Sequence, residues 1–126
     1  MQEESQVVVI TPEEKRQMCD ELADHLPKIR SLLNVTQAEL GYLCGFSRIR
    51  VSQIETKVAK MTWSQLTSIV LLCFENMRTK EYFYANDLLG VRFLQFMQRK
   101  DENIPPNANV NVREELIQYK DKFKKD

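Results

Sequence analysis

Residues 36–56 read Thr-Gln-Ala-Glu-Leu-Gly-Tyr-Leu-Cys-Gly-Phe-Ser-Arg-Ile-Arg-Val-Ser-Gln-Ile-Glu-Thr, a pattern of two short helices joined by a tight turn. Thr36, followed three residues later by Glu39, has the spacing of a capping box, so the first helix is predicted to begin there. Gly45 suits the turn because it has no Cβ to oppose a positive φ or a close helix–helix approach. Ser47 is then expected to cap the second helix.

Such a pair of helices can pack only if the positions between them are apolar or small. Counted from Gln37 as the first motif position, the inward positions are all apolar: Leu40, Cys44, Phe46, Val51 and Ile54. Gly41 stands where the helices should cross most closely, and its small size fits that crossing. Five apolar sites together with two well-placed glycines make the signal specific.

The segment before this pair is predicted to be helical. Residues 11–14 combine a capping threonine, a proline at the first helical position and a capping-box glutamate. The apolar spacing extends this helix to Leu33, while Pro27 should kink or split it near residues 24–26. The apolar run at residues 7–10 is compatible with either a short strand or an arm.

Three further helices are predicted after the pair. One begins at the capping-box pattern of residues 62–65 and runs through about Met77. The next is expected over residues 86–100, whose first two residues would form its cap. After a loop over 101–111, a charged helix is predicted over 112–123. The sequence shows no strand pairs and no repeats, so the predicted fold class is all-α.

Charge is distributed unevenly along a chain whose formal net charge is zero. Residues 1–27 carry a net charge of −5, residues 28–60 a net charge of +4, and the remainder +1. A protein that faces phosphate needs local positive potential rather than a high overall pI. Because the positive segment coincides with the helix pair, a nucleic-acid surface is favoured over an ordinary solvated face.

Metal and redox chemistry find little support. Cys19, Cys44 and Cys73 are widely spaced in apolar helical contexts, and with a single histidine a zinc site lacks ligands. The cysteines are therefore expected to be buried in a reducing cytosol, with a redox-sensing thiol as the alternative. No metal and no cofactor is expected.

Catalysis and membrane insertion are also disfavoured. The chain has no glycine-rich phosphate loop and no HExxH motif, so it is not expected to be an enzyme. Asp20, Glu21 and Asp24 share helical spacing and are interpreted as a solvated acidic face rather than catalytic carboxylates. No apolar run reaches transmembrane length and the N-terminus is acidic, which predicts a cytoplasmic protein without membrane contact.

From about Leu26 to Cys73, the sequence resembles the lambda-repressor-like helix-turn-helix family (Cro/CI or xenobiotic-response-element type). Residues 26–40 match that family's first helix, loop and second-helix opening, residues 47–55 its recognition helix, and residues 64–72 its fourth helix. Two departures are Thr56-Lys57 after the recognition helix and glycine instead of alanine at position 41. The resemblance implies a five-helix DNA-binding domain, here with additional C-terminal helices, in a bacterial or phage-encoded protein.

On this basis the chain divides into three parts. Residues 1–21 would form an N-terminal arm and helix start, residues 22–77 the helix-turn-helix domain, and residues 78–126 a C-terminal helical extension that serves dimerisation.

The resemblance also implies which residues meet DNA bases. Arg48, Ile49 and Gln53 lie opposite the buried face of the second helix and are expected to contact bases in the major groove. Arginine makes bidentate bonds to guanine, glutamine to adenine, and an apolar side chain can meet a thymine methyl group. The alternative is an ordinary solvated helix face.

Other residues are expected to hold the DNA backbone or the reading helix. In the family, the residue at the position of Gln37 bonds a phosphate from a helix N-terminus. Further backbone contacts are assigned to Arg50, Ser52, Lys57 and Lys60, with solvated lysines as the alternative for the last two. Arg30 and Glu55 match a family ion pair that ties the first helix to the end of the recognition helix.

A homodimer is expected to form through the C-terminal extension, because one recognition helix covers only a few base pairs. The predicted interface residues are apolar or aromatic: Tyr82, Phe83, Leu89, Phe93, Phe96 and Met97. Val91 and Leu94 would point to a different side of the same helix. The alternative is that both faces are buried within one monomer.

The resulting functional expectation is a sequence-specific transcriptional regulator, in particular a repressor, that binds an inverted repeat in double-stranded DNA as a dimer. One alternative is a DNA-binding antitoxin whose C-terminal half wraps a toxin protein. The other is a protein-interaction module that keeps the fold without reading DNA.

Overall fold

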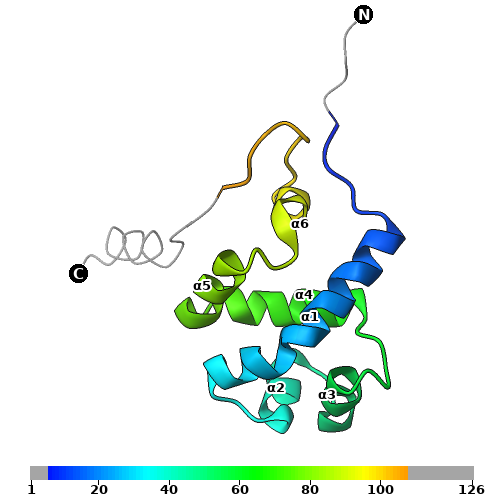
Figure 1. The fold of residues 1–126 in the computed structure, drawn as a ribbon, viewed down its shortest axis with the longest axis vertical. Helices are drawn as coiled ribbons and strands as arrows, with labels where there is room; N and C mark the ends of the chain where they lie inside the picture. Colours follow the sequence, from blue (N-terminus) through cyan, green and yellow to red (C-terminus); the bar gives the residue numbers. More distant parts are fainter. Residues whose placement is uncertain (1–5, 108–126) are drawn as a thin grey trace, which may run out of the picture.

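The computed structural model describes residues 6–107, and in that range the chain is all-α, as the sequence predicts (Figure 1). Its six helices are α1 (Pro12–Leu33), α2 (Gln37–Cys44), α3 (Arg48–Glu55), α4 (Trp63–Phe74), α5 (Met77–Ala85) and α6 (Gly90–Met97). The helix predicted over 112–123 lies outside the described residues.

α1 begins at its expected capping box, in which the Thr11 hydroxyl accepts from the Glu14 amide and the Glu14 carboxylate accepts from the Thr11 amide. The helix continues through Pro27, so the split considered from the sequence does not occur. A proline removes one backbone hydrogen bond. Leu26 and Ile29 nevertheless hold this part of the helix against the core, because their fully buried side chains contribute about 1.5–3 kcal/mol each.

The helix pair α2–α3 forms at the predicted residues. Thr36 and Ser47 cap the two helices through their side chains, and Gly45 ends α2 with a φ of 88°. The five inward positions face the core: Leu40, Val51 and Ile54 are fully buried, and Cys44 and Phe46 are partly buried.

Gly41 marks the tightest contact of this pair. A Cβ at Gly41 would lie 2.3 Å from the carbonyl oxygen of Phe46 and 3.2 Å from the carbonyl carbon of Ser47. The carbonyl oxygen of Gly41 accepts hydrogen bonds from the amides of Gly45 and Phe46, at 2.8 and 2.9 Å. The turn therefore folds directly over this residue and leaves no room for a side chain.

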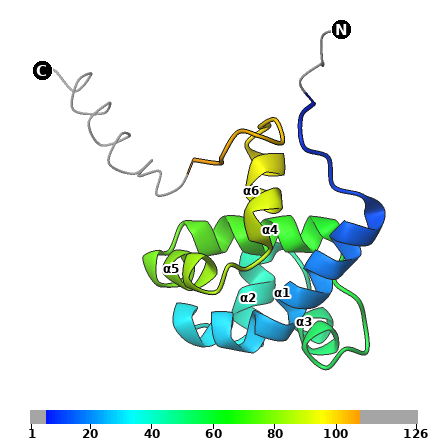
Figure 2. The same cartoon turned by 45° about the horizontal axis from the view of Figure 1, so that its top comes forward.

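α1 and α4 run through the middle of the molecule, with α2 and α3 on one side of them and α6 on the other (Figures 1 and 2). All six helices contribute to one core, whose largest fully buried members are Phe93, Leu22, Leu26, Ile29, Leu40, Ile54, Leu66, Ile69, Val51 and Cys73. The helix pair α2–α3 thus packs on a core to which the C-terminal helices α5 and α6 also contribute.

The region after α4 differs from the sequence prediction. α4 ends at Phe74, and Asn76 caps an additional helix, α5, that contains the aromatic run 82–84. Asn86 and Asp87 do not begin a helix: Asn86 is the C-cap of α5, and Asp87 belongs to a turn with left-handed residues, where φ is 47° at Asp87 and 67° at Leu89. The expected single helix to residue 100 is therefore wrong, and α6 covers only Gly90–Met97.

Half of the six predicted dimer-interface residues are buried inside this core. Phe83, Leu89 and Phe93 are at most 4% exposed. Phe96 packs against the ring of Trp63 with centroids 6.3 Å apart. The remaining two residues differ from each other: the Tyr82 hydroxyl lies 2.7 Å from His25 Nδ1, whereas Met97 is 49% exposed. Because Phe83, Leu89 and Phe93 are buried in the core of a single chain, they are not available to a second copy.

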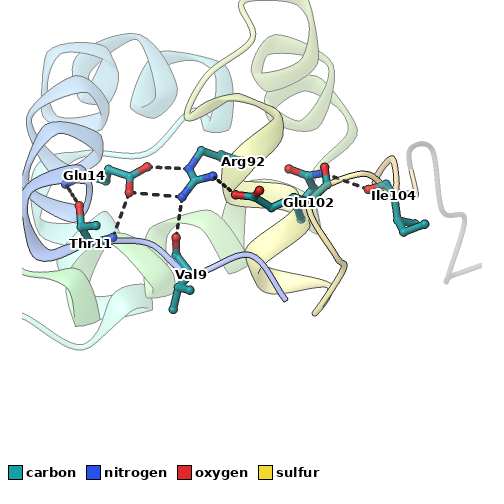
Figure 3. Close-up of polar contacts among 7 residues, drawn as sticks. Val9, Thr11, Glu14, Arg92, Glu102 and Ile104 are labelled. Carbon is teal, nitrogen blue, oxygen red and sulfur yellow. Dashed lines mark hydrogen bonds and ion pairs between the residues drawn. The ribbon is translucent and has the colours of Figure 1, made fainter. Parts of the chain in front are cut away.

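The apolar run at the start of the chain forms an arm rather than a strand. It makes one isolated antiparallel bridge, Val7 to Asp101, with Val8 N donating to Lys100 O at 2.9 Å. Arg92 of α6 fastens the arm further, because its guanidinium donates to Val9 O and to the Glu14 carboxylate, each at 2.7 Å (Figure 3). We call these contacts the Arg92 clasp; a weaker bond to Glu102 at 3.4 Å completes it.

The Arg92 clasp predicts an acid-sensitive contribution to stability. The hydrogen bond from Arg92 is the largest cause that lowers the pKa of Glu14 from 4.5 to about 2. A carboxylate whose folded-state pKa is lowered stabilises the fold above pH 4.5 and loses that effect as pH falls towards 2. Glu14→Gln should therefore lower the melting temperature at pH 7, with the difference from wild type vanishing near pH 2.

Circular dichroism during heating, at several pH values, measures this difference. Glu13→Gln is the matched control, because Glu13 is an exposed first-turn acid that does not contact Arg92. A difference for Glu14→Gln that stays constant from pH 7 to pH 2 would contradict the assignment.

The cysteines are free thiols; Cys19 and Cys73 are buried and Cys44 is partly buried. Burial raises the pKa of all three, that of Cys73 to about 12. Among residues 6–107 no cluster of three or more histidine, cysteine or acidic side chains could hold a metal ion. No helix in that range is both long enough and apolar enough to cross a membrane.

Candidate nucleic-acid interface

α3 lies at one end of the molecule, together with α2, while α6 and the arm lie beyond α1 and α4 (Figures 1 and 2). Val51 and Ile54 lie on the inner face of α3 and are fully buried. On the outer face Arg48 is exposed, Ile49 is 63% exposed, and Gln53 is partly exposed. The three predicted base-contact residues therefore share the solvent face of a helix whose opposite side is fixed in the core.

The C-terminal end of α3 is held by backbone contacts. The carbonyl oxygen of Gln53 accepts from the amides of Val58 and Ala59, at 2.9 and 3.1 Å. Arg50 donates from Nη2 to the carbonyl oxygen of Lys60 at 2.8 Å, so its side chain spans the connection from α3 to α4. Arg50 thus braces this connection, a role that the sequence did not reveal.

Arg30 and Glu55 form the ion pair that the sequence predicts. Arg30 donates from Nε to Glu55 Oε2 at 2.6 Å and from Nη2 to Oε1 at 2.9 Å. The two side chains are 21% and 7% exposed, and the hydrogen bonds to Glu55 raise the pKa of Arg30. Such a bidentate geometry fixes direction as well as distance, so α3 is held at a set angle to α1.

Gln37 joins the same network. Its side-chain amide donates to Glu55 Oε1 at 3.0 Å, from the first residue of α2. Glu55 therefore connects α1, α2 and α3 at one point. Ser52, also assigned to the DNA backbone, is partly exposed on α3, and its carbonyl oxygen accepts from the Thr56 hydroxyl at 2.9 Å.

Lys57 and Lys60 point towards α1 instead of the outer face of α3. Lys57 Nζ lies 2.7 Å from Asp24 Oδ1 and donates to Asp20 O at 3.1 Å. Lys60 Nζ lies 3.7 Å from Asp20 Oδ2. From the sequence these two acids are expected to form a solvated face, because ion pairs between residues 33 (57 − 24) and 40 (60 − 20) positions apart leave no local signal.

Comparisons of the chain with protein-family models, with curated proteins and with solved structures found no match.

Proposed function

We propose that this protein is a sequence-specific DNA-binding transcriptional regulator of the lambda-repressor-like type, with α3 as its recognition helix. The observation that carries the proposal is the exposure of Ile49, at 63%, beside Arg48 on a capped helix with a fully buried inner face. Exposed apolar side chains occur elsewhere on this protein as well, and what sets Ile49 apart is its place beside Arg48 on the outer face of α3. A major groove accepts an α-helix and presents thymine methyl groups to such a side chain.

In the proposed complex Arg48 bonds guanine and Gln53 bonds adenine in the major groove. Gln37 reaches a phosphate from the N-terminus of α2, where free backbone amides also favour an anion. Its bond to Glu55 holds the side chain near the position from which it would reach that phosphate.

We infer that two copies bind an inverted repeat, and that the regulator acts as a repressor. An eight-residue recognition helix covers few base pairs, and a two-fold dimer doubles the site. Since Phe83, Leu89 and Phe93 belong to the core, the two copies would have to meet through other surfaces.

The protein-interaction alternative has one observation in its favour. Tyr42 and Leu43 of α2 and Val58 after α3 are 86%, 53% and 76% exposed, and apolar groups at a surface suit a protein partner. Selection of binding sites from random DNA separates the two functions. Enrichment of a palindromic site supports the dimeric regulator, whereas no enrichment supports the interaction module.

Substitutions on α3 test the assignment of the base contacts. Arg48→Ala and Gln53→Ala should each weaken binding to the selected site by about 1–3 kcal/mol, with little change for unrelated DNA. Gln37→Ala should weaken binding to all DNA alike. Fluorescence anisotropy with labelled duplexes measures both affinities.

Arg99→Ala supplies the matched control, because Arg99 is an exposed arginine beyond α6, on the side away from α3. Unchanged affinity and base preference in both α3 variants would show that α3 is not the recognition helix.

A further inference from the structure

The ion pairs between α1 and the α3–α4 connection are open to solvent. The side chains of Lys57 and Asp24 are 48% and 63% exposed, and those of Lys60 and Asp20 are 73% and 49% exposed. Ion pairs with this exposure contribute little to stability. Another anion can therefore replace either carboxylate at small cost.

Only the lysine side chains need to move in such an exchange. The backbone of the connection is already fixed by the two bonds to Gln53 O and by Arg50. Lys57 and Lys60 are joined to this fixed backbone by flexible four-carbon chains. Their ammonium groups can thus turn from α1 towards DNA while α3 keeps its position.

We propose that Asp20 and Asp24 form an acidic mask that competes with DNA phosphates for the ammonium groups of Lys57 and Lys60. The inference rests on the proposed function and concerns its regulation. Because phosphate contacts carry no sequence information, the mask lowers the affinity for every DNA alike. It keeps non-specific binding weak while Arg48 and Gln53 remain free to read bases.

The acidic mask also changes how binding depends on salt. A lysine that neutralises a phosphate releases a condensed cation, which steepens the slope of log K against log salt by about 0.9. A lysine that leaves a carboxylate exposes that carboxylate to cations again. This uptake offsets part of the release, so masked lysines contribute less than their full share to the slope.

The test compares the full chain with the variant Asp20→Asn/Asp24→Asn on a non-specific duplex. Removing the mask should tighten binding about threefold to tenfold near 0.1 M salt, and should steepen the slope by less than about 1.8, which is the full release from two lysines. Glu75→Gln/Glu81→Gln is the control for net charge, because it removes the same number of negative charges from exposed acids at the C-terminal end of α4 and on α5. An equal gain in the control variant would overturn the proposal.

A double-mutant cycle shows whether the effect passes through the lysine. In a Lys57→Gln background, Asp24→Asn should no longer change DNA affinity, since the ammonium group that it masks is absent. A gain from Asp24→Asn that is the same with and without Lys57 would also overturn the mask.

Elution from immobilised heparin separates this inference from the proposed function. Heparin is a polyanion without bases, so the mask variant should elute at higher salt than wild type and than the charge-matched Glu75→Gln/Glu81→Gln. Later elution without any sequence-selected DNA would support the mask and count against the regulator. Identical elution of all three proteins would contradict the proposed acidic mask, regardless of which DNA the protein binds.

Discussion

Glu55→Ala is expected to lower the free energy of unfolding by about 3 kcal/mol, at the lower end of the range for breaking a buried ion pair. Glu55 is 7% exposed and accepts two hydrogen bonds from Arg30 and one from Gln37. Alanine would leave the Arg30 guanidinium, itself 21% exposed, without its carboxylate. Urea denaturation followed by circular dichroism measures the loss.

Two variants show whether this cost belongs to the buried network. Glu55→Gln keeps an oxygen acceptor and should recover part of the stability. Asp24→Ala breaks the exposed pair with Lys57 and should cost less than about 1 kcal/mol. If Glu55→Ala costs no more than Asp24→Ala, Glu55 does not hold the three helices together.

Gly41→Leu is expected to destabilise the protein by about 3 kcal/mol or more, since overpacking beside fixed backbone cannot be relieved by a side-chain rotation. Its Cβ would meet the Phe46 carbonyl oxygen at 2.3 Å, so the turn between α2 and α3 must shift. Even Gly41→Ala should destabilise, although alanine in a helix interior normally gains about 1 kcal/mol over glycine. Urea unfolding of both variants measures the cost.

The exposed α2 position Ala38 provides the control. Ala38→Gly should cost less than about 1 kcal/mol through helix propensity alone, because Ala38 lies in the first turn of α2. If Gly41→Ala is as stable as wild type or more stable, the α2–α3 pair can open without cost and the tight crossing is not a constraint.

The helices that could be predicted from sequence carry their own local signals. Thr11, Thr36 and Thr62 each stand three residues before a glutamate or glutamine, and each begins a helix at the expected place. Capping residues act within one turn, so their effect can be predicted without knowledge of the fold.

The region after α4 could not be predicted, because its structure depends on distant contacts. The helix break near residue 75 is the exception, because its contacts are local: the Asn76 side chain accepts from the Arg78 amide, and the buried Thr79 hydroxyl donates to Cys73 O at 2.6 Å. Leu89 adopts a φ of 67°, which leucine disfavours in isolation, and its side chain is 4% exposed. Burial against the other helices outweighs the local preference there, and it also places Phe83 and Phe93 in the core.

The candidate site also contains both kinds of residue: some whose direction could be predicted from local sequence, and others whose direction depends on distant contacts. The outward position of Arg48, Ile49 and Gln53 followed from helical spacing on a single short helix. The directions of Lys57 and Lys60 did not, because they depend on where α1 passes beside the α3–α4 connection. The sequence contains the charges, but only the fold sets which of them meet.

The Arg92 clasp has a consequence for the order of folding. It joins Arg92 to Val9, two residues 83 positions apart, whereas the α2–α3 pair closes over a few residues. Closing the longer loop costs more chain entropy. The hydrogen bonds from Arg92 to the arm therefore form only after the helices have assembled. Contacts that form last and lie at the surface also open first. Local opening of the native state should therefore begin with the surface bonds of the Arg92 clasp, while Val8 and Ile10 still hold the arm to the core and Val51 and Ile54 anchor α3.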